Sequence, residues 1–199
     1  MDLAGIILAA GASRRMGAPK ALLRLDKETF LERLIRVYAE FFSPVVVVLG
    51  AEADTVRRGL HRDAPARFVV NEHWPSGQLT SLQCGVTSVR DETGGCFFTP
   101  VDCPRVNPAT IAALVGAMNQ GSPPPLVVMP RHGSRRGHPV GLSRELFDDL
   151  LSLAANESAR AVVHGHPDRT WIVDVEDAGV LDDVDTLDDY QRLERSVSS

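Results

Sequence analysis

Runs of apolar residues alternate along the chain with stretches in which apolar positions recur every three or four residues. Residues 45–49, four valines and a leucine, form an uninterrupted run that ends at Gly50. This pattern is typical of a strand buried on both faces of a sheet. Similar short runs predict further strands at residues 6–8, 67–70, 96–101, 126–129 and 171–175.

Helical spacing follows most of these runs. Residues 30–38 place apolar side chains on one face, with Thr29 as the expected N-cap and Glu32 three residues after it. Strands that alternate with helices predict an α/β fold of three layers, in which a mostly parallel sheet carries helices on both faces. No internal repeat or long linker divides the chain, so residues 1–199 are expected to form a single domain. The other helices are expected at residues 53–60, 79–89, 108–119, 144–153, 158–164 and 186–196.

Polar and glycine-rich segments come directly after several of the predicted strands. In open α/β sheets, ligands bind outside the carboxyl ends of the strands. We therefore expect the functional residues within residues 11–20, residues 71–81, Asp102 and residues 131–139.

Composition narrows the classes of function. The chain is 44% hydrophobic and carries a net charge of -5, which argues against nucleic acid as a partner. No apolar run approaches membrane-spanning length and no signal-like leader opens the sequence, so no membrane partner is expected. The sparse, odd set of Cys84, Cys96 and Cys103 fits a reducing compartment, and we expect a cytoplasmic protein in which these residues are packing residues.

The loop of residues 8–20, with the sequence LAAGASRRMGAPK, has the composition of an anion-binding turn. Small residues let backbone N–H groups approach an anion closely, and Arg15 and Lys20 would bring positive charge to a triphosphate. Neither the GxxxxGK[ST] nor the GxGxxG pattern is present. For the loop taken alone, a basic surface turn after a strand is the less favoured alternative.

Two further segments have both a functional and an ordinary interpretation. Asp102 follows a predicted strand, where its carboxylate suits Mg²⁺, although an aspartate before Pro104 also begins many turns. Residues 71–82 end in a predicted helix whose N–H groups could hold a phosphate or a base edge. The ordinary alternative there is helix capping by Thr80 or Ser81.

The remaining polar segments are a basic and an acidic one. Residues 131–140 form a basic glycine-rich loop, for which a solvated hairpin tip is the alternative. Residues 181–190 are acidic, and Asp185 or Thr186 is expected to cap the last helix. His164 has no neighbours to complete a zinc site, and Trp171 is expected in the core.

The loop of residues 8–20 resembles the signature L-A-A-G-x-S-x-R-M-G-x-x-K of the molybdenum cofactor cytidylyltransferase and guanylyltransferase family, nucleotidyltransferases with a Rossmann-like fold. The likeness runs from Leu3 to about Leu193. It implies that Arg15, Lys20 and Asp102 are catalytic. It also implies that the nucleotide is bound by Leu8, Ala9, Ala10, Gly11, Ser13, Arg15, Lys20, Asn71, Gly77 and Ser81.

Further motifs carry the resemblance into the second half of the chain. The D-x-P element at Asp102 and the D-x-D-T element at Asp185 are similar to the metal-binding aspartates of the family, which implies Mg²⁺ as the cofactor. The family often has proline where Leu187 stands. The R-G-H-P-V element is similar to the segment that faces the acceptor, which implies that Arg136 and His138 bind it.

The resemblance also implies the substrates. Ala10 stands where the guanylyl branch usually has a second glycine, so the cytidylyl branch is favoured. The implied reaction joins CTP and molybdenum–molybdopterin into the cytosine dinucleotide cofactor and releases pyrophosphate. A guanylyltransferase, a sugar- or alditol-phosphate nucleotidyltransferase, and an idle binding module that hands cofactor to a molybdoenzyme are the alternatives. The expected partners are small molecules, with transient contact to a molybdoenzyme as one possibility.

Overall fold

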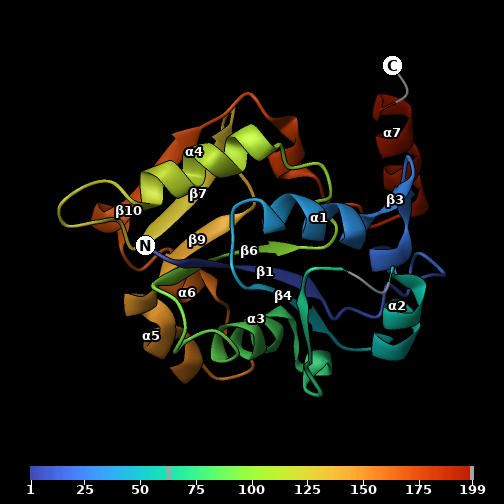
Figure 1. The fold of residues 1–199 in the computed structure, drawn as a ribbon, viewed down its shortest axis with the longest axis horizontal. Coiled ribbons are helices and arrows are strands. Elements are labelled where there is room, and N and C mark those ends of the chain that lie inside the picture. The colour runs from blue at the N-terminus through green and yellow to red at the C-terminus, as the bar shows by residue number, and fades with distance from the viewer. Residues whose placement is uncertain (62–63, 198–199) are drawn as a thin grey trace.

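The computed structural model describes residues 1–61 and 64–197. Its main sheet has the strand order β10-β7-β9-β6-β1-β4-β5, with β8 paired to β7, and β2 and β3 form a small separate hairpin (Figure 1). The predicted α/β fold with a mostly parallel sheet is confirmed. The strands are β1 (Leu3–Ala9), β2 (Arg24–Leu25), β3 (Glu28–Thr29), β4 (Val45–Leu49), β5 (Arg67–Val70), β6 (Gly95–Pro100), β7 (Val127–His132), β8 (Arg135–Arg136), β9 (Val140–Ser143) and β10 (Thr170–Asp174).

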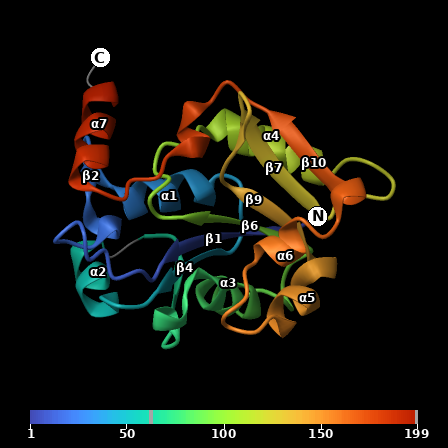
Figure 2. The same cartoon turned by 180° about the vertical axis from the view of Figure 1, so that it is seen from behind.

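Helices cover both faces of this sheet, as Figures 1 and 2 show. Helices α1 and α4 pack on one face and α3, α5 and α6 on the other. Every predicted helix is present with its bounds moved by a few residues; the predicted helix at residues 144–153 begins with a 3₁₀ turn. The helices are α1 (Phe30–Ala39), α2 (Ala53–Gly59), α3 (Gln78–Thr87), α4 (Pro108–Met118), α5 (Phe147–Ser152), α6 (Arg160–Val163) and α7 (Leu187–Val197).

The central strands are buried on both faces, which explains their unbroken apolar sequences. Successive side chains of a strand point to opposite faces. In β4, Val47 joins the core under α1 and α4, and Val46 and Val48 join the core over α3. In β1, which pairs with both β4 and β6, Ile7 and Ile6 divide in the same way. The sheet is therefore held between two apolar layers.

The sequence did not predict the antiparallel strand β9 in the middle of the sheet. β9 is antiparallel to both β6 and β7, between which it lies. Gly141 fits there because a Cβ at this position would lie 2.5 Å from the ring of Phe97. Of the two interpretations of residues 131–140, the structure agrees with the hairpin, because Arg135 and Arg136 pair with the end of β7.

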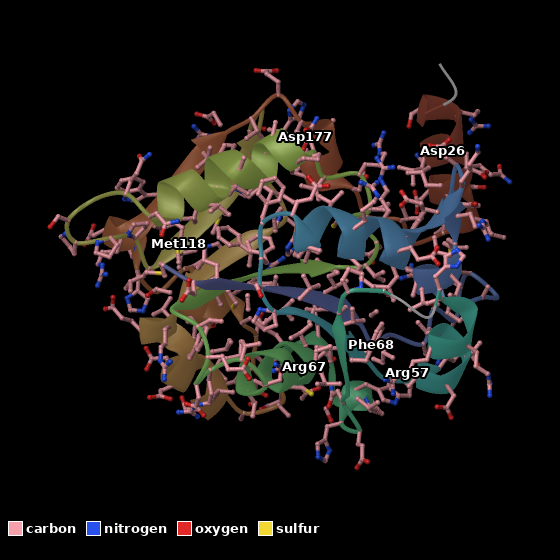
Figure 3. All side chains as sticks on the ribbon, viewed as in Figure 1. Asp26, Arg57, Arg67, Phe68, Met118 and Asp177 are labelled. Atoms are coloured by element: carbon pink, nitrogen blue, oxygen red, sulfur yellow. The ribbon has the colours of Figure 1, made fainter. Side chains whose placement is uncertain are left out.

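Local hydrogen bonds set several helix ends. Thr29 and Glu32 form the predicted capping box of α1. Asn107 caps α4, and Asp177 accepts hydrogen bonds from the Asn107 N–H and the Thr110 hydroxyl beside it. Figure 3 shows Asp177 near the start of α4. These contacts tie the start of α4 to the segment that leads to the site.

The edges of the sheet hold residues that are half exposed. Trp171, on the edge strand β10, is 36% exposed, so its predicted place in the core is wrong; the strand has a neighbour on one side only. At the other edge, the Arg57 guanidinium lies 5.2 Å from the ring centre of Phe68 (Figure 3). Among the described helices, none is long and apolar enough to cross a membrane.

Candidate active site

The loop after β1 is folded around Ser13. This residue has a left-handed backbone with φ of 48°, and its carbonyl accepts a hydrogen bond from the Met16 N–H at 2.9 Å. Its hydroxyl oxygen accepts one from the Lys20 N–H, also at 2.9 Å. Met16 is buried in the core and anchors the middle of the loop. Small residues and one serine thus give the loop a fixed path past the carboxyl end of β1.

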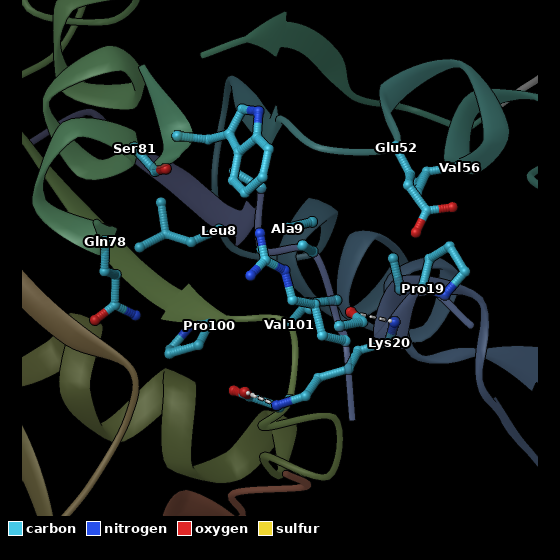
Figure 4. A pocket seen from close by; sticks show the side chains of 18 of the residues that line it. Leu8, Ala9, Pro19, Lys20, Glu52, Val56, Gln78, Ser81, Pro100 and Val101 are labelled. Carbon is cyan, nitrogen blue, oxygen red and sulfur yellow. Dashed lines mark hydrogen bonds and ion pairs between the residues drawn. The ribbon is translucent and has the colours of Figure 1, made fainter. Parts of the chain in front are cut away.

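The Lys20 ammonium lies between two carboxylates that come from distant parts of the chain. Its Nζ is 2.9 Å from Asp102 Oδ2 and 2.6 Å from Asp185 Oδ1 (Figure 4). Asp102 follows β6, the neighbour of β1 in the sheet, and Asp185 lies just before α7. The Val184 N–H donates to the Asp102 carbonyl, which links the two carboxylate segments. The structure therefore brings together the predicted cation and both predicted metal ligands.

The charges of this group shift one another's pKa values. Burial alone would lower the pKa of Lys20, but the hydrogen bonds and charges of Asp185 and Asp102 outweigh burial and raise it. The hydrogen bond from Lys20 and the charges of Lys20 and Arg15 lower the pKa of Asp185. The pKa of Asp183 is raised, by burial first and then by the charges of Asp102 and Asp185. A cation at this point thus stabilises carboxylates that would otherwise repel one another.

A third carboxylate completes a donor set for a metal ion. Oxygen atoms of Asp102, Asp183 and Asp185 all lie within 4.8 Å of one another. Hard oxygen ligands of this kind suit Mg²⁺ or Mn²⁺. Arg15 Nη2 lies 3.0 Å from Asp185 Oδ2, so a second cation faces the same group. Sequence reasoning had placed Asp183 on a solvated acidic face.

The segment that carries these aspartates is fixed from behind. The Cys103 thiol donates to the Asp182 carbonyl at 2.9 Å, and burial raises the pKa of Cys103. Arg105 holds the nearly buried Asp182 carboxylate through two hydrogen bonds. Cys103 is therefore a packing thiol, as its place in the D-x-P element suggested, and Asp182 positions the chain rather than facing the cavity.

The segment between β5 and α3 forms the opposite wall. Asn71 is buried, and its amide donates to the Thr80 and Ser81 hydroxyls. Gly77, with φ of 113°, precedes the first residue of α3, so neither Thr80 nor Ser81 takes the N-cap position. Gly77 and Ser81 line the cavity, whereas Asn71 lies behind it and holds the wall together.

These walls enclose a cavity of about 560 Å³ at the carboxyl ends of the parallel strands (Figure 4). The backbone of the loop after β1 forms one side, and the predicted residues on it, Asp102 and Asp185 all reach the cavity. Trp74 and Gln78 also line it, although the sequence did not single them out. Their signal was only the position of the segment after a strand. The predicted lining residues are Leu8, Ala9, Ala10, Gly11, Ser13, Arg15, Lys20, Gly77, Ser81, Asp102 and Asp185.

The predicted acceptor residues lie in a second, neighbouring cavity of about 460 Å³. Arg136 and His138 line it, together with α6 residues that sequence reasoning did not assign to the site. Gly137 between them packs against Val180, since a Cβ there would lie 2.1 Å from the Val180 carbonyl oxygen. The two cavities share Leu8 and Gln78, which places the acceptor segment beside the first cavity.

The loop after β1, a lysine and a carboxylate cluster surround one cavity of an α/β sheet, the arrangement expected for a nucleotidyltransferase. The chain belongs to the family described as MobA-like NTP transferase domain, which matches residues 5–170. The family resemblance drawn from the loop of residues 8–20 is thereby confirmed, and the chain is a member of an enzyme family of nucleotidyltransferases.

Two named relatives cover nearly the whole chain, and a third covers two thirds of it. The molybdenum cofactor cytidylyltransferase of Escherichia coli is 27% identical over 93% of this chain and 92% of that protein. A protein named nicotine blue oxidoreductase, from Paenarthrobacter nicotinovorans, is 29% identical over 95% of both chains. A probable molybdenum cofactor guanylyltransferase of Pelotomaculum thermopropionicum is 32% identical over 67% of this chain and 59% of that protein.

Solved structures share the fold. The crystal structure of Rv0371c from Mycobacterium tuberculosis H37Rv superposes with a TM-score of 0.83 at 30% identity and covers 98% of both chains. A structure of the same protein in complex with manganese gives a TM-score of 0.77 at 28% identity, covering 98% of this chain and 100% of that one.

Proposed function

We propose that this protein transfers CMP from CTP to the phosphate of a molybdopterin-type acceptor, forming the cytosine dinucleotide cofactor and pyrophosphate. The observation that carries the proposal is the Lys20 ammonium between Asp102 and Asp185, at a cavity lined by the loop after β1. This arrangement supplies positive charge for a polyphosphate and oxygen ligands for a divalent ion. The name of the Escherichia coli relative supports the choice of acceptor.

Mg²⁺ is the cofactor that this donor set fits. Asp102 and Asp185 would hold it, with Asp183 near enough to contribute a third oxygen. When bound, a divalent ion neutralises charge on the phosphate oxygens of the nucleotide. The Mycobacterium tuberculosis protein has been crystallised in complex with manganese, which supports a divalent ion as a ligand of this fold.

The chain's own residues have positioning and charge-stabilising roles. Lys20 and Arg15 would bind the β- and γ-phosphates and stabilise the negative charge of the departing pyrophosphate. Backbone N–H groups of the loop after β1 would hold the triphosphate, and Ser81 and Trp74 the base and sugar. An acceptor phosphate oxygen attacks the α-phosphorus as the bond to pyrophosphate breaks. A phosphate monoester is already largely ionised at neutral pH, so no side-chain base is required.

Two observations favour CTP over GTP. Ala10 stands in the lining of the cavity where the guanylyl branch usually has a second glycine. Ala10 and Trp74 also pack over Gly50, where a Cβ would lie within 2.8 Å of both side chains. The cytidylyltransferase relative matches across 93% of the chain, whereas the guanylyltransferase relative matches 67%.

One relative that matches 95% of this chain is named an oxidoreductase, so similarity over the whole chain does not by itself decide which reaction is catalysed. The carboxylates around Lys20 favour phosphate chemistry here, because hydride transfer has no need of a metal-binding donor set. We further propose that residues 1–199 form one domain. The protein would act in the cytoplasm, where its three unpaired cysteines would remain reduced. It would deliver the finished cofactor to a molybdoenzyme through a transient contact.

The deciding experiment measures pyrophosphate release with CTP or GTP, each with and without molybdopterin, in Mg²⁺ buffer. We expect release only when CTP and molybdopterin are both present. Equal or faster turnover with GTP would assign the guanylyl reaction. Release that molybdopterin does not stimulate but a sugar or alditol phosphate does would assign another acceptor. Nucleotide binding without any turnover would indicate that the protein is a binding module and not an enzyme.

A further inference from the structure

The second cavity is walled by segments that are distant in sequence. Its residues come from the hairpin β7–β8, from β9, from the start of α3 and from α6. Leu8 and Gln78 form the boundary with the nucleotide cavity. A ligand that fills the second cavity therefore meets a bound nucleotide at this boundary and extends from it toward α6.

The far end of this cavity is cationic. Arg136 and Arg160 both line it, and neither has a carboxylate within ion-pair distance in the described part of the chain. The nearby Arg131 differs, because Asp174 neutralises it at 2.6 Å. The one lining carboxylate, Glu157, accepts a hydrogen bond from the Ala154 N–H.

His164 adds a hydrogen-bond donor to this cluster. It lies one turn after Arg160, and its N–H bonds to the Arg160 carbonyl at 2.9 Å, so both side chains lie on one face. Arg136 Nη1 lies 3.4 Å from His164 Nδ1. Arginine can only donate, so Nδ1 accepts and the ring proton lies on Nε2. In this arrangement Nε2 is the nitrogen that can donate to a ligand.

His138 lines the same cavity, but its Nδ1 exposes almost no surface and has no hydrogen-bond partner among the described residues. This atom therefore lies in the wall and is not open to a ligand. The polar groups that the cavity offers to an anion are those of Arg136, Arg160 and His164.

We infer that Arg136, Arg160 and His164 bind a second anionic group of the acceptor, distinct from its attacking phosphate. The inference rests on the proposed function, because the phosphate must lie at the Gln78 boundary to reach the α-phosphorus. The substrate class is a phosphate monoester on a ring system whose other end carries an anionic or strongly hydrogen-bond-accepting group. A neutral sugar or alditol phosphate lacks such a group and leaves these cations unpaired.

Arg160→Gln and His164→Asn test the inference, with Arg90→Gln as the matched control. Arg90 pairs with Asp148 on the surface, outside both cavities. In Mg²⁺ and CTP, we expect each cavity variant to raise the KM for molybdopterin about tenfold, the usual effect of losing a hydrogen bond to a charged group. The KM for CTP and the kcat should stay within about twofold, because this contact is uniform binding.

The same kinetics would overturn the inference in two ways. Both cavity variants could keep the wild-type KM for molybdopterin, or they could change it no more than they change the KM for CTP. All three variants replace side chains that are at least partly exposed, so their thermal unfolding should match that of the wild type and confirm intact folding.

A second measurement decides the inference if the wild type shows no turnover with any acceptor. Inorganic phosphate is titrated into protein with ¹⁵N-labelled histidine rings. A shift of His164 that Arg160→Gln abolishes and Lys20→Ala retains supports the anionic subsite and leaves only the proposed function in error. A His164 signal that does not move with phosphate, or that moves equally in Arg160→Gln, overturns the subsite.

Discussion

The two neighbouring cavities are built in different ways. The nucleotide cavity takes a whole wall and its lysine from one continuous loop, which the Ser13 hydrogen bonds and buried Met16 hold in shape. The acceptor cavity takes its cations from β8 and from α6, which only tertiary packing brings together. The polar contact between Arg136 and His164 joins side chains from these two regions.

Under the proposed function, this difference gives the first cavity the role of catalysis and the second cavity the role of selecting the acceptor. In the proposed reaction, Lys20 and the carboxylates around it would act on the reacting phosphates that every nucleotidyl transfer shares, so they would suit any acceptor. The second cavity can change its lining through α6 without disturbing the loop after β1. Variants in the first cavity should therefore affect turnover, and variants in the second should affect the choice of acceptor.

The largest expected effect comes from the carboxylate-bound lysine. Lys20→Ala and Asp102→Asn should each lower kcat by ~10²–10³, because each removes a preorganised charge at the reacting phosphates. Pyrophosphate release with CTP and molybdopterin measures the loss. Lys27→Ala, at an exposed turn, is the matched control and should retain wild-type turnover. Turnover near the wild-type level in both cavity variants would contradict the proposed mechanism.

The same contrast governs what the sequence could predict. Periodicity predicted the helices and central strands because both faces of the sheet are apolar, and the contiguous LAAGASRRMGAPK loop carried enough residues to be recognised. The antiparallel strand β9 was not predicted. It has only four residues, and a segment this short does not reveal from its sequence which strands it pairs with or in which direction. The apolar residues next to Trp171 in the sequence predicted that it is buried. Its strand lies at the edge of the sheet, however, and the order of the strands cannot be derived from the sequence pattern.

The residues of the candidate site show the same contrast between those that a sequence motif identifies and those that only packing brings together. Asp102 and Asp185 were predicted from motifs, and the structure places both on Lys20. Asp183 and His164 were not assigned to the site, because their roles depend on which segments pack beside them. Asn71 was expected to face the nucleotide, and its amide instead bonds two hydroxyls behind the wall.

A substitution in β9 tests how closely this antiparallel strand packs in the sheet. Gly141→Ala should destabilise the protein by about 1–3 kcal/mol, because the added methyl group would lie 2.5 Å from the buried Phe97 ring. Gly116→Ala is the matched control: a methyl group added there would meet no atom within 4 Å, and removing a glycine from α4 should stabilise by about 0.5–1 kcal/mol. Urea unfolding measures both, and equal stability of the two variants would refute the packing argument.

The third carboxylate offers a smaller effect, confined to the nucleotide cavity. A unit charge about 4 Å from a divalent ion contributes about 2 kcal/mol at the dielectric constant of water, so Asp183→Asn should weaken Mn²⁺ binding by roughly thirtyfold. Electron paramagnetic resonance of free Mn²⁺ measures the affinity without turnover. Asp188→Asn, on the first turn of α7, is the control and should bind Mn²⁺ as the wild type does. An unchanged affinity in Asp183→Asn would limit the donor set to Asp102 and Asp185.

The smallest expected effect is the pH dependence that His138 adds to stability. Burial lowers the pKa of His138, and the hydrogen bond with the Phe98 backbone and the charge of Asp102 only partly oppose this shift. A lowered folded-state pKa means that the unfolded chain binds the proton more readily. The stability from the neutral ring is therefore complete above the ordinary histidine pKa of about 6.5 and is lost progressively as the pH falls below it, toward the folded-state value.

His138→Gln should remove this dependence. In urea unfolding at pH 7.5, 6.5 and 5.5, the wild type should lose more stability than the variant, by at most about 1.4 kcal/mol per pH unit for one proton. His73→Gln, at an exposed position, should keep the wild-type slope. Parallel slopes for wild type and His138→Gln would mean that the buried ring does not titrate with unfolding. A difference confined to His138 would show that burial keeps this imidazole neutral in the folded protein.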